Sequence, residues 1–277
     1  MTSYRVFQFK LPLSDLRGVR GSLIAALLLS VGLSNSPAFA SECFTSFYRG
    51  AAPVITSPRL EHGTRELCYQ SFAVLASSLS HTGLWSAEHL TRGNIEAARA
   101  LGGRYGRWHA DIHLSAAERA VPRDYTNSGY DRGHLSPSGD MPTPAADAET
   151  FTMANVAPQL PHLNRGSWEQ AESLTRDIAV FVGETWVVTG VLFEGANVQQ
   201  IGNGVLVPTA FYKALLIPGR GAAVYVATNE AMPRWQVISL LALKQRSGVD
   251  AFPTLSTSIK NTAAELPMPG ARHRRVQ

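Results

Sequence analysis

Three stretches in the C-terminal half of the chain have the apolar, β-branched and aromatic composition of sheet strands. Gly and Pro residues punctuate them, as expected where strands end in turns. The predicted strands cover residues 185–193, 205–217 and 222–228. Residues 65–79 (RELCYQSFAVLASSL) are too densely apolar to decide between a helix and a strand, and we expect them to be buried in either form.

Two further segments are typical of helices. Apolar side chains recur at helical spacing in residues 167–182, and Gly183 follows as a stop signal. Residues 240–246 form the second predicted helix, with Ser239 as its N-cap and Gly248 beyond its end. Because strands and helices do not alternate regularly, the pattern favours an α+β fold with packed helices and a mixed, largely antiparallel sheet over a doubly wound parallel sheet.

The first forty residues have the pattern of a secretory signal peptide. Basic residues precede an apolar run at 23–33 that is short for a bilayer span, and residues 38–40 (AFA) match a small-x-small cleavage site. Cleavage after residue 40 would release an exported protein, periplasmic or extracellular, with no membrane attachment. An uncleaved membrane anchor is the alternative, although no stop-transfer run follows.

The rest of the chain has the length of one globular domain and shows no internal repeat. We expect residues 41–265 to form this domain and the basic residues 266–277 to form a disordered tail. The whole chain has 25 Lys and Arg against 21 Asp and Glu, but the leader holds four of these basic residues and only one of the acids. Net charge therefore does not indicate nucleic-acid binding, and any such surface must be local.

The chain contains two cysteines, Cys43 and Cys68. In a chain exported to an oxidising compartment, they are expected to form a disulfide. Closing this loop restricts the unfolded chain and would stabilise the fold by roughly a few kcal/mol. Since no histidine pattern accompanies the cysteines, they do not indicate a zinc site.

A tetrapeptide near the middle of the chain combines a carboxylate, a guanidinium and an imidazole, from Asp131, Arg132 and His134. Imidazole can accept a proton from water near neutral pH, and guanidinium matches the geometry of phosphate oxygens. This composition is typical of a site that cleaves phosphodiester bonds. For the tetrapeptide alone, a satisfied histidine beside a surface ion pair is the alternative.

A second polar group lies at the start of the helix predicted at 167–182. Asn164, Trp168 and Glu172 recur every fourth residue, so a helix that includes all three would place them on one side. The Asn164 amide oxygen and the Glu172 carboxylate would then face a common space, with Trp168 between them. The alternative is a helix N-cap, a core residue and a surface acid.

Taken together, the two groups resemble the DNA/RNA non-specific endonucleases, the ββα-metal nucleases of the Serratia nuclease and endonuclease G type. The first matching block is residues 124–137 (DYTNSGYDRGHLSP), and the second is residues 155–159 (NVAPQ) with the three helix positions. Asn164 follows the motif histidine by thirty residues, as in that family. The resemblance covers residues 85–255.

The resemblance implies a ββα-metal unit, in which a strand hairpin delivers His134 opposite a helix that carries the metal ligand. It implies that Asn164 binds one Mg²⁺ ion directly, with Mn²⁺ able to substitute, and that Glu172 acts on the ion through water. His134 would be the general base of a hydrolysis that leaves 5′-phosphate ends. Arg132 would stabilise charge on the phosphate, and Asp131 would orient neighbouring groups.

The resemblance implies that Asn155 contacts the substrate or supports the residues that do. It also implies a phosphate contact from an upstream arginine, for which Arg104, Arg107 or neither of them could serve. Contacts to phosphates predict cleavage of DNA or RNA without sequence or sugar specificity. Two other classes stay open, a catalytically silent nucleic-acid-binding protein on the same scaffold and a metal-dependent phosphodiesterase of small substrates. The sequence has no heptad pattern that would indicate an oligomeric state.

Overall fold

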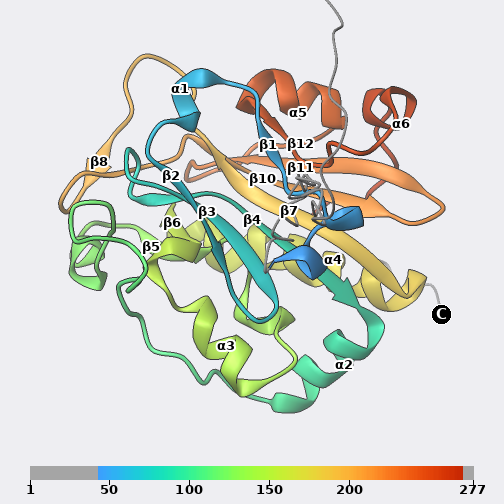
Figure 1. Ribbon diagram of the computed structural model, residues 1–277, viewed down its shortest axis with the longest axis horizontal. Helices are drawn as coiled ribbons and strands as arrows, with labels where there is room; N and C mark the ends of the chain where they lie inside the picture. The colour runs from blue at the N-terminus through green and yellow to red at the C-terminus, as the bar shows by residue number, and fades with distance from the viewer. Residues whose placement is uncertain (1–42, 271–277) are drawn as a thin grey trace, which may run out of the picture. The chain divides into compact units, whose positions relative to one another are not determined.

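The computed structural model of the chain describes residues 43–270 (Figure 1). The predicted signal peptide at 1–40 and residues 271–277 of the predicted tail lie outside the described residues. Within residues 43–270, no helix combines the length and apolarity that a membrane crossing requires.

A seven-stranded sheet with the order β12-β11-β10-β7-β4-β3-β2 forms the centre of the fold. All of its neighbouring strands pair antiparallel, which confirms the predicted sheet type. The strands are β2 (Thr64–Cys68), β3 (Phe72–Ser77), β4 (Thr82–Thr91), β7 (Glu184–Leu192), β10 (Ala210–Ile217), β11 (Gly221–Thr228) and β12 (Trp235–Ile238).

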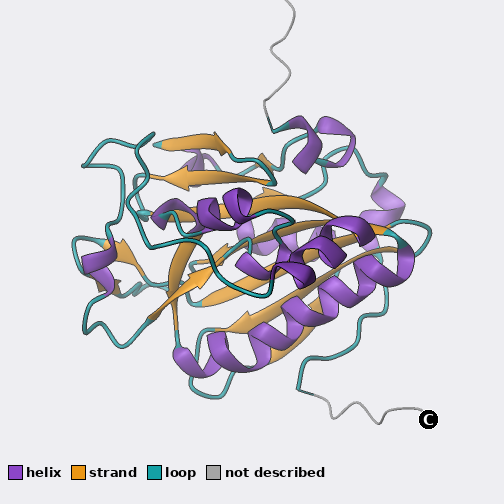
Figure 2. Cartoon of the chain, turned by 90° about the horizontal axis from the view of Figure 1, so that it is seen from below, coloured by secondary structure: helices purple, strands orange, loops and turns teal. Residues whose placement is uncertain are grey.

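Helices cover both faces of this sheet, which gives the α+β architecture. Figure 1 shows α5 (Leu240–Ser247) and α6 (Thr257–Asn261) on one side, and α2 (Arg92–Leu101) and α3 (Pro144–Thr150) on the other. The long helix α4 (Glu169–Val182) contacts β4, β7 and β10. Figure 2 shows helices lying across the strands on this second side.

Because helices cover both faces of the sheet, its central strands are buried on both sides, and this explains the composition from which they were predicted. Every residue of β10 and six of the eight in β11 are buried, so these strands are apolar almost throughout, apart from the buried Lys213. The predicted strand at 205–217 is interrupted, because only β9 (Val205–Leu206) and β10 are strands and Pro208, which has no amide hydrogen, lies between them. The predicted helix at 240–246 is confirmed as α5, with the Ser239 hydroxyl accepting from the Ala242 amide.

The ambiguous segment at 65–79 forms the hairpin of β2 and β3. The neighbouring strand β4 was not predicted, because the buried polar residues Ser86 and Glu88 interrupt its apolar pattern. The shorter elements are α1 (Pro58–Glu61), the pair of β1 (Val54–Ile55) with β13 (Val249–Asp250), and the pair of β8 (Gln200–Ile201) with β9.

A separate hairpin carries the polar tetrapeptide. Strand β5 (Asp131–His134) pairs antiparallel with β6 (Val156–Gln159), and the helical segment that precedes α4 follows β6. Glycine is required at 133, because a Cβ at this position would collide with the Gln159 side chain. Two strands and a helix thus form the arrangement expected for a ββα unit.

The two ends of the described region are fixed to the domain. Cys43 and Cys68 form the predicted disulfide, which ties the N-terminal segment to β2. Residues 266–270 were expected to be disordered, but the Tyr225 hydroxyl donates to the Pro267 carbonyl (2.6 Å) and the Gly270 amide donates to the Gln170 side chain (2.7 Å). The boundary predicted at 265 is therefore too early.

We expect replacement of both cysteines by alanine to lower the free energy of unfolding by about 3 kcal/mol, the value for closing a loop of this size. The disulfide joins residues 25 positions apart, and its loss restores conformational freedom to the unfolded chain. Urea unfolding of the two proteins measures the difference. Two titratable thiols in denatured, unreduced wild-type protein would contradict the disulfide itself.

Candidate active site

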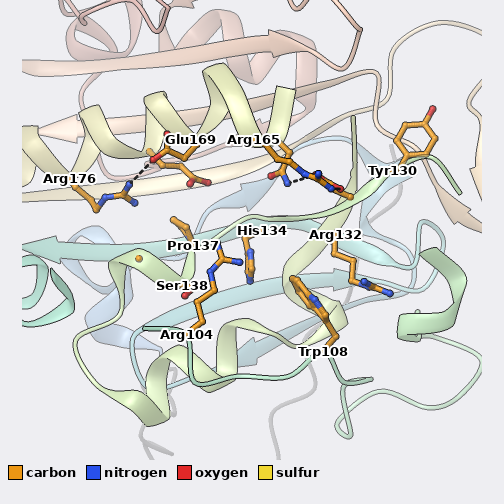
Figure 3. Close-up of a pocket in the computed structure, with 14 residues that line it drawn as sticks. Arg104, Trp108, Tyr130, Arg132, His134, Pro137, Ser138, Arg165, Glu169 and Arg176 are labelled. Carbon is orange, nitrogen blue, oxygen red and sulfur yellow. Dashed lines mark hydrogen bonds and ion pairs between the residues drawn. The ribbon is translucent and has the colours of Figure 1, made fainter. Parts of the chain in front are cut away.

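The ββα unit opens onto a cavity of about 570 Å³ between β5 and the helix that follows β6. Figure 3 shows side chains from both elements pointing into the same space. The cavity brings together six of the predicted site residues: Arg104, Asp131, Arg132, His134, Asn164 and Glu172. Asn155 and Arg107 do not line it.

His134 stands at the end of β5 against two aromatic rings. Its ring lies 4.8 Å from Trp108 and 5.2 Å from Phe151, measured between centroids. Its Nε2 is buried and has no hydrogen-bond partner among residues 43–270. Burial, and then the positive charge of Arg104, lower the pKa of His134 to about 3. The imidazole is therefore neutral, which is the form that can accept a proton.

Asp131 joins the hairpin to the helix. Its carboxylate accepts from the Asn164 side-chain amide (2.9 Å) and from two nitrogens of Arg165 (2.7 and 2.5 Å). Although partial burial opposes the shift, these hydrogen bonds hold the pKa of Asp131 below its usual value. Because the amide nitrogen of Asn164 is engaged by Asp131, its oxygen is the atom left to face the cavity.

A π-helical segment, Leu163–Trp168, precedes α4. The helix start therefore differs from the regular helix on which the predicted placement of Asn164, Trp168 and Glu172 was based. The backbone of the segment is interrupted at Gly166, which has non-helical torsion angles (φ −118°, ψ −108°), and Trp168 at its end is fully buried against Phe211 (5.5 Å between ring centroids). The prediction that Trp168 lies between Asn164 and Glu172 in the cavity is wrong. The N-cap alternative for Asn164 is also wrong, because its backbone amide donates to a carbonyl one turn earlier.

The first turns of α4 supply charged side chains to the far end of the cavity. Arg176 is bound to the buried Asp140 (2.9 Å) and lies 3.9 Å from Glu169. Burial raises the pKa of Glu172 to about 7, against the opposing effect of Lys213 and Arg176. A cation bound nearby would lower the pKa of Glu172 again, because a cation favours the charged form of a carboxyl group.

The arginines around the cavity differ in what holds them. Figure 3 shows Arg104 beside His134 and the Arg132 guanidinium turned away from it. Arg132 donates to the Pro122 carbonyl (2.7 Å) and lies 5.6 Å from the ring of Trp108. This placement does not support Arg132 as the direct phosphate ligand. Of the two upstream candidates, Arg104 lines the cavity and Arg107 does not.

Asn155 is not placed to contact a substrate. It is fully buried, its side-chain oxygen accepts from the Ser136 amide (3.0 Å), and its nitrogen donates to the carbonyls of Ser136 (2.8 Å) and Thr150 (3.0 Å). These bonds fix the backbone directly after His134. Of the two roles expected for Asn155, this placement agrees with support of the site and not with direct contact to a substrate.

Several cavity residues were missed from the sequence. Arg176 could have been found from its position one helical turn after Glu172, and Arg165 from its place beside Asn164. Tyr130 directly precedes Asp131 and Glu169 lies between Asn164 and Glu172, so both could have been found in the same way, whereas no local signal indicated Trp108. The missed lining residues include Trp108, Tyr130, Arg165, Glu169 and Arg176.

Comparison with known proteins places these features in a family. The sequence profile described as DNA/RNA non-specific endonuclease matches residues 52–258. The chain is 32% identical over 206 residues to mitochondrial endonuclease G of Bos taurus, a match that covers 67% of this chain and 68% of that protein. It is also 32% identical to nuclease C1 of Cunninghamella echinulata var. echinulata, covering 68% of this chain and 83% of that protein.

The fold is shared with a solved structure as well. A chain in the crystal structure of the EndoG/EndoGI complex superposes with a TM-score of 0.62 at 22% identity, covering 71% of this chain and 89% of that chain. This likeness supports the α+β architecture described above.

We expect His134 to destabilise the metal-free protein in acid. Its folded pKa of about 3 lies below the ordinary value of 6.5, so between these values the unfolded chain binds a proton that the folded chain does not. The free energy of unfolding should fall as the pH drops through this window, and less steeply in His134→Gln. Urea unfolding at a series of pH values measures both slopes. An NMR titration that gave the imidazole of His134 a pKa near 6.5 would contradict the lowered pKa.

Proposed function

The chain belongs to the DNA/RNA non-specific endonuclease family and is a metal-dependent endonuclease, and we propose that it is exported and hydrolyses phosphodiester bonds of DNA or RNA without sequence specificity, leaving 5′-phosphate ends. One observation carries this proposal. A neutral imidazole from β5 and an oriented amide oxygen from the helical segment line the same cavity. His134 and Asn164 can therefore act on one phosphate from two elements.

The donor set of the cavity fits a hard divalent cation such as Mg²⁺, with Mn²⁺ able to substitute. The Asn164 oxygen would hold the ion directly, and Glu172 would accept hydrogen bonds from the waters around it. When bound, the ion would stabilise negative charge on the phosphate and on the departing 3′ oxygen.

His134 is the proposed general base. A pKa of about 3 is low for this role, since a base works best when its pKa lies near the working pH. The positive charge of Arg104 contributes to that low value. A bound phosphate would offset this charge, so substrate binding would raise the pKa of His134 and improve it as a proton acceptor.

Arg104 is the proposed phosphate ligand. Arg165 and Arg176 also line the cavity, but both are paired with carboxylates, Asp131 and Asp140. Within the described part of the chain, no carboxylate lies within ion-pair distance of Arg104, so its charge is available to a phosphate. Arg132 is the ligand expected from the sequence, but its guanidinium lies against the ring of Trp108. It would therefore contribute positive charge to the site without binding the phosphate directly.

The export proposal is supported by the leader pattern at 1–40 and by the disulfide, because disulfides persist in oxidising compartments. Some relatives, such as endonuclease G, are mitochondrial, so localisation needs its own test. N-terminal sequencing of the protein from cell fractions would distinguish a start at Ser41 from a retained leader.

We expect His134→Ala to lower the rate of cleavage by about 10²- to 10⁴-fold, the range for losing a general base, and Asn164→Ala to lower it as well, through loss of the proposed metal ligand. Purified protein starting at Ser41 is incubated with plasmid DNA and with RNA, in Mg²⁺ and in EDTA. EDTA should abolish cleavage of both polymers by the wild-type protein.

Full cleavage by His134→Ala would rule out this residue as the base. No cleavage of either polymer by the folded wild-type protein would favour a silent nucleic-acid-binding protein. Hydrolysis of small phosphodiesters alone would favour the small-substrate alternative.

Arg104 and Arg107 form a matched pair, because both are exposed and only Arg104 lines the cavity. Loss of a charge-assisted hydrogen bond worth about 1.5–3 kcal/mol should lower kcat/KM of Arg104→Ala by about 10- to 100-fold. Arg107→Ala should behave like the wild-type protein in the same plasmid assay. Equal losses in the two variants would show that Arg104 acts only through general surface charge.

A further inference from the structure

The last described residues, 263–270, form a strap that runs along α4 and has no part in the chemistry proposed above. At its start, the Ala264 amide donates to the Ala222 carbonyl of β11 (2.9 Å). At its end, the Gly270 amide donates to the side-chain oxygen of Gln170 in the first turn of α4 (2.7 Å). This C-terminal strap therefore connects the sheet to the start of the active-site helix.

The C-terminal strap follows α4 from the C-terminal end of this helix to its N-terminal end. Arg220, two residues before Ala222, lies 5.1 Å from the ring of Phe181, near the end of α4. Gln170, the partner of Gly270, is the second residue of α4. Between these points the strap and the helix line a common cavity of about 260 Å³, whose residues include Glu265 and Pro267 from the strap and Leu174 and Ile178 from α4.

Contacts along its length fix the C-terminal strap to the domain. The Tyr225 hydroxyl donates to the Pro267 carbonyl (2.6 Å). Leu266 packs against the buried cluster that includes Tyr225, and Pro269 is itself buried. The fold therefore determines where Gly270 lies, and with it the point from which the chain continues.

The C-terminal strap ends beside the active-site cavity. Gln170 directly follows Glu169, which lines this cavity. A chain extends by at most about 3.6 Å per residue, so the Cα atom two positions after Gly270 lies within roughly 7 Å of the Gly270 Cα. The residue at that position is Arg272. The chain thus continues into residues 271–277 from a point next to the cavity.

The residues that follow the strap differ in charge from the rest of the domain. Residues 271–277 (ARHRRVQ) contain three arginines, one histidine and no Asp or Glu. Residues 41–270 contain 18 Lys and Arg against 20 Asp and Glu, so these three arginines give the chain beyond its leader its small positive charge. Because Arg165 and Arg176 are paired with carboxylates in the cavity, the cavity itself offers a polyanion little uncompensated charge.

We propose that the C-terminal strap holds the arginines of residues 271–277 beside the active-site cavity, where they bind phosphates that flank the one being cleaved. A DNA strand carries a phosphate about every 3.4 Å along the helix axis, so flanking phosphates lie within reach of these arginines. Guanidinium groups bind phosphate oxygens through charge-assisted hydrogen bonds, whatever the base sequence. This inference rests on the proposed nuclease function and adds a binding segment that takes no part in the chemistry.

The test compares the wild-type protein, starting at Ser41, with a triple variant that carries Arg272→Gln, Arg274→Gln and Arg275→Gln. Binding of a fluorescent DNA duplex is measured in EDTA, where no cleavage occurs, over a range of KCl concentrations. At about 0.1 M salt the triple variant should bind about 10- to 100-fold more weakly, and its plot of log binding constant against log salt should be less steep by about 2–3, since each bound phosphate contributes about 0.9. Its kcat on saturating plasmid DNA in Mg²⁺ should equal that of the wild-type protein.

A second triple variant removes the same charge elsewhere. Arg49→Gln, Arg59→Gln and Arg220→Gln replace three exposed arginines that do not line the active-site cavity, and the salt dependence should stay that of the wild-type protein. Equal changes in the two triple variants would overturn the inference, because residues 271–277 would then act only through general charge. Tighter binding or faster cleavage without the three C-terminal arginines would also overturn it, because these residues would then obstruct the cavity.

Gln170→Ala tests the placement by the strap, because it removes the acceptor of the Gly270 amide and keeps every charge. It should weaken duplex binding by about 2- to 10-fold, as for loss of one hydrogen bond, but not when the three C-terminal arginines are already replaced. Equal effects in the two backgrounds, including no effect in either, would overturn the placement. A wild-type protein that binds the duplex but cleaves no nucleic acid in Mg²⁺ would overturn the proposed hydrolysis alone, since the salt dependence is measured without cleavage.

Discussion

The hydrogen bonds that Asp131 accepts are the constraint on which the active site depends. They connect β5 to the helical segment across 33 and 34 positions of sequence, through Asn164 and Arg165. A primary amide carries a donor and an acceptor, so the bond to its nitrogen decides that its oxygen faces the cavity. The same contact holds the hairpin that carries His134 against the helical segment that carries Asn164, the proposed metal ligand. Loss of the carboxylate would therefore disturb orientation and spacing together.

The residues of the π-helical segment and the start of α4 have two opposing packing requirements. Asn164 and Glu172 must face the cavity, whereas the large ring of Trp168 gains most from burial in the core. An uninterrupted regular helix would place all three residues on one side, because residues four apart are only about 40° apart around the axis. The irregular backbone of Leu163–Trp168, with non-helical torsion angles at Gly166, interrupts this placement: Trp168 packs against Phe211, and Asn164 and Glu172 line the cavity. π-Helical segments occur frequently at functional sites.

Much of the fold and the main members of the site could be predicted from the sequence, because their signals are local. Continuous apolar runs indicated β7, β10 and β11, and two polar groups placed His134 and Asn164 in one site. The roles of Arg132 and Asn155 could not be predicted in this way. The direction of each side chain depends on partners contributed by other segments, the Pro122 carbonyl for Arg132 and the Thr150 carbonyl for Asn155. Strand β4 was missed because its buried polar residues interrupt the apolar pattern by which a buried strand is predicted.

The electrostatics of the site are local, in agreement with the small net charge of the chain beyond its leader. Most of the cavity's charges compensate one another in pairs, such as Arg165 with Asp131 and Arg176 with Asp140. Such pairs contribute little net attraction for a polyanion, but they hold the side chains in fixed positions. The attraction must then come from the charges without a partner, and Arg104 beside His134 is one of them. A site of this kind recognises a phosphate by position rather than by overall charge, which suits an enzyme that reads the backbone and not the bases.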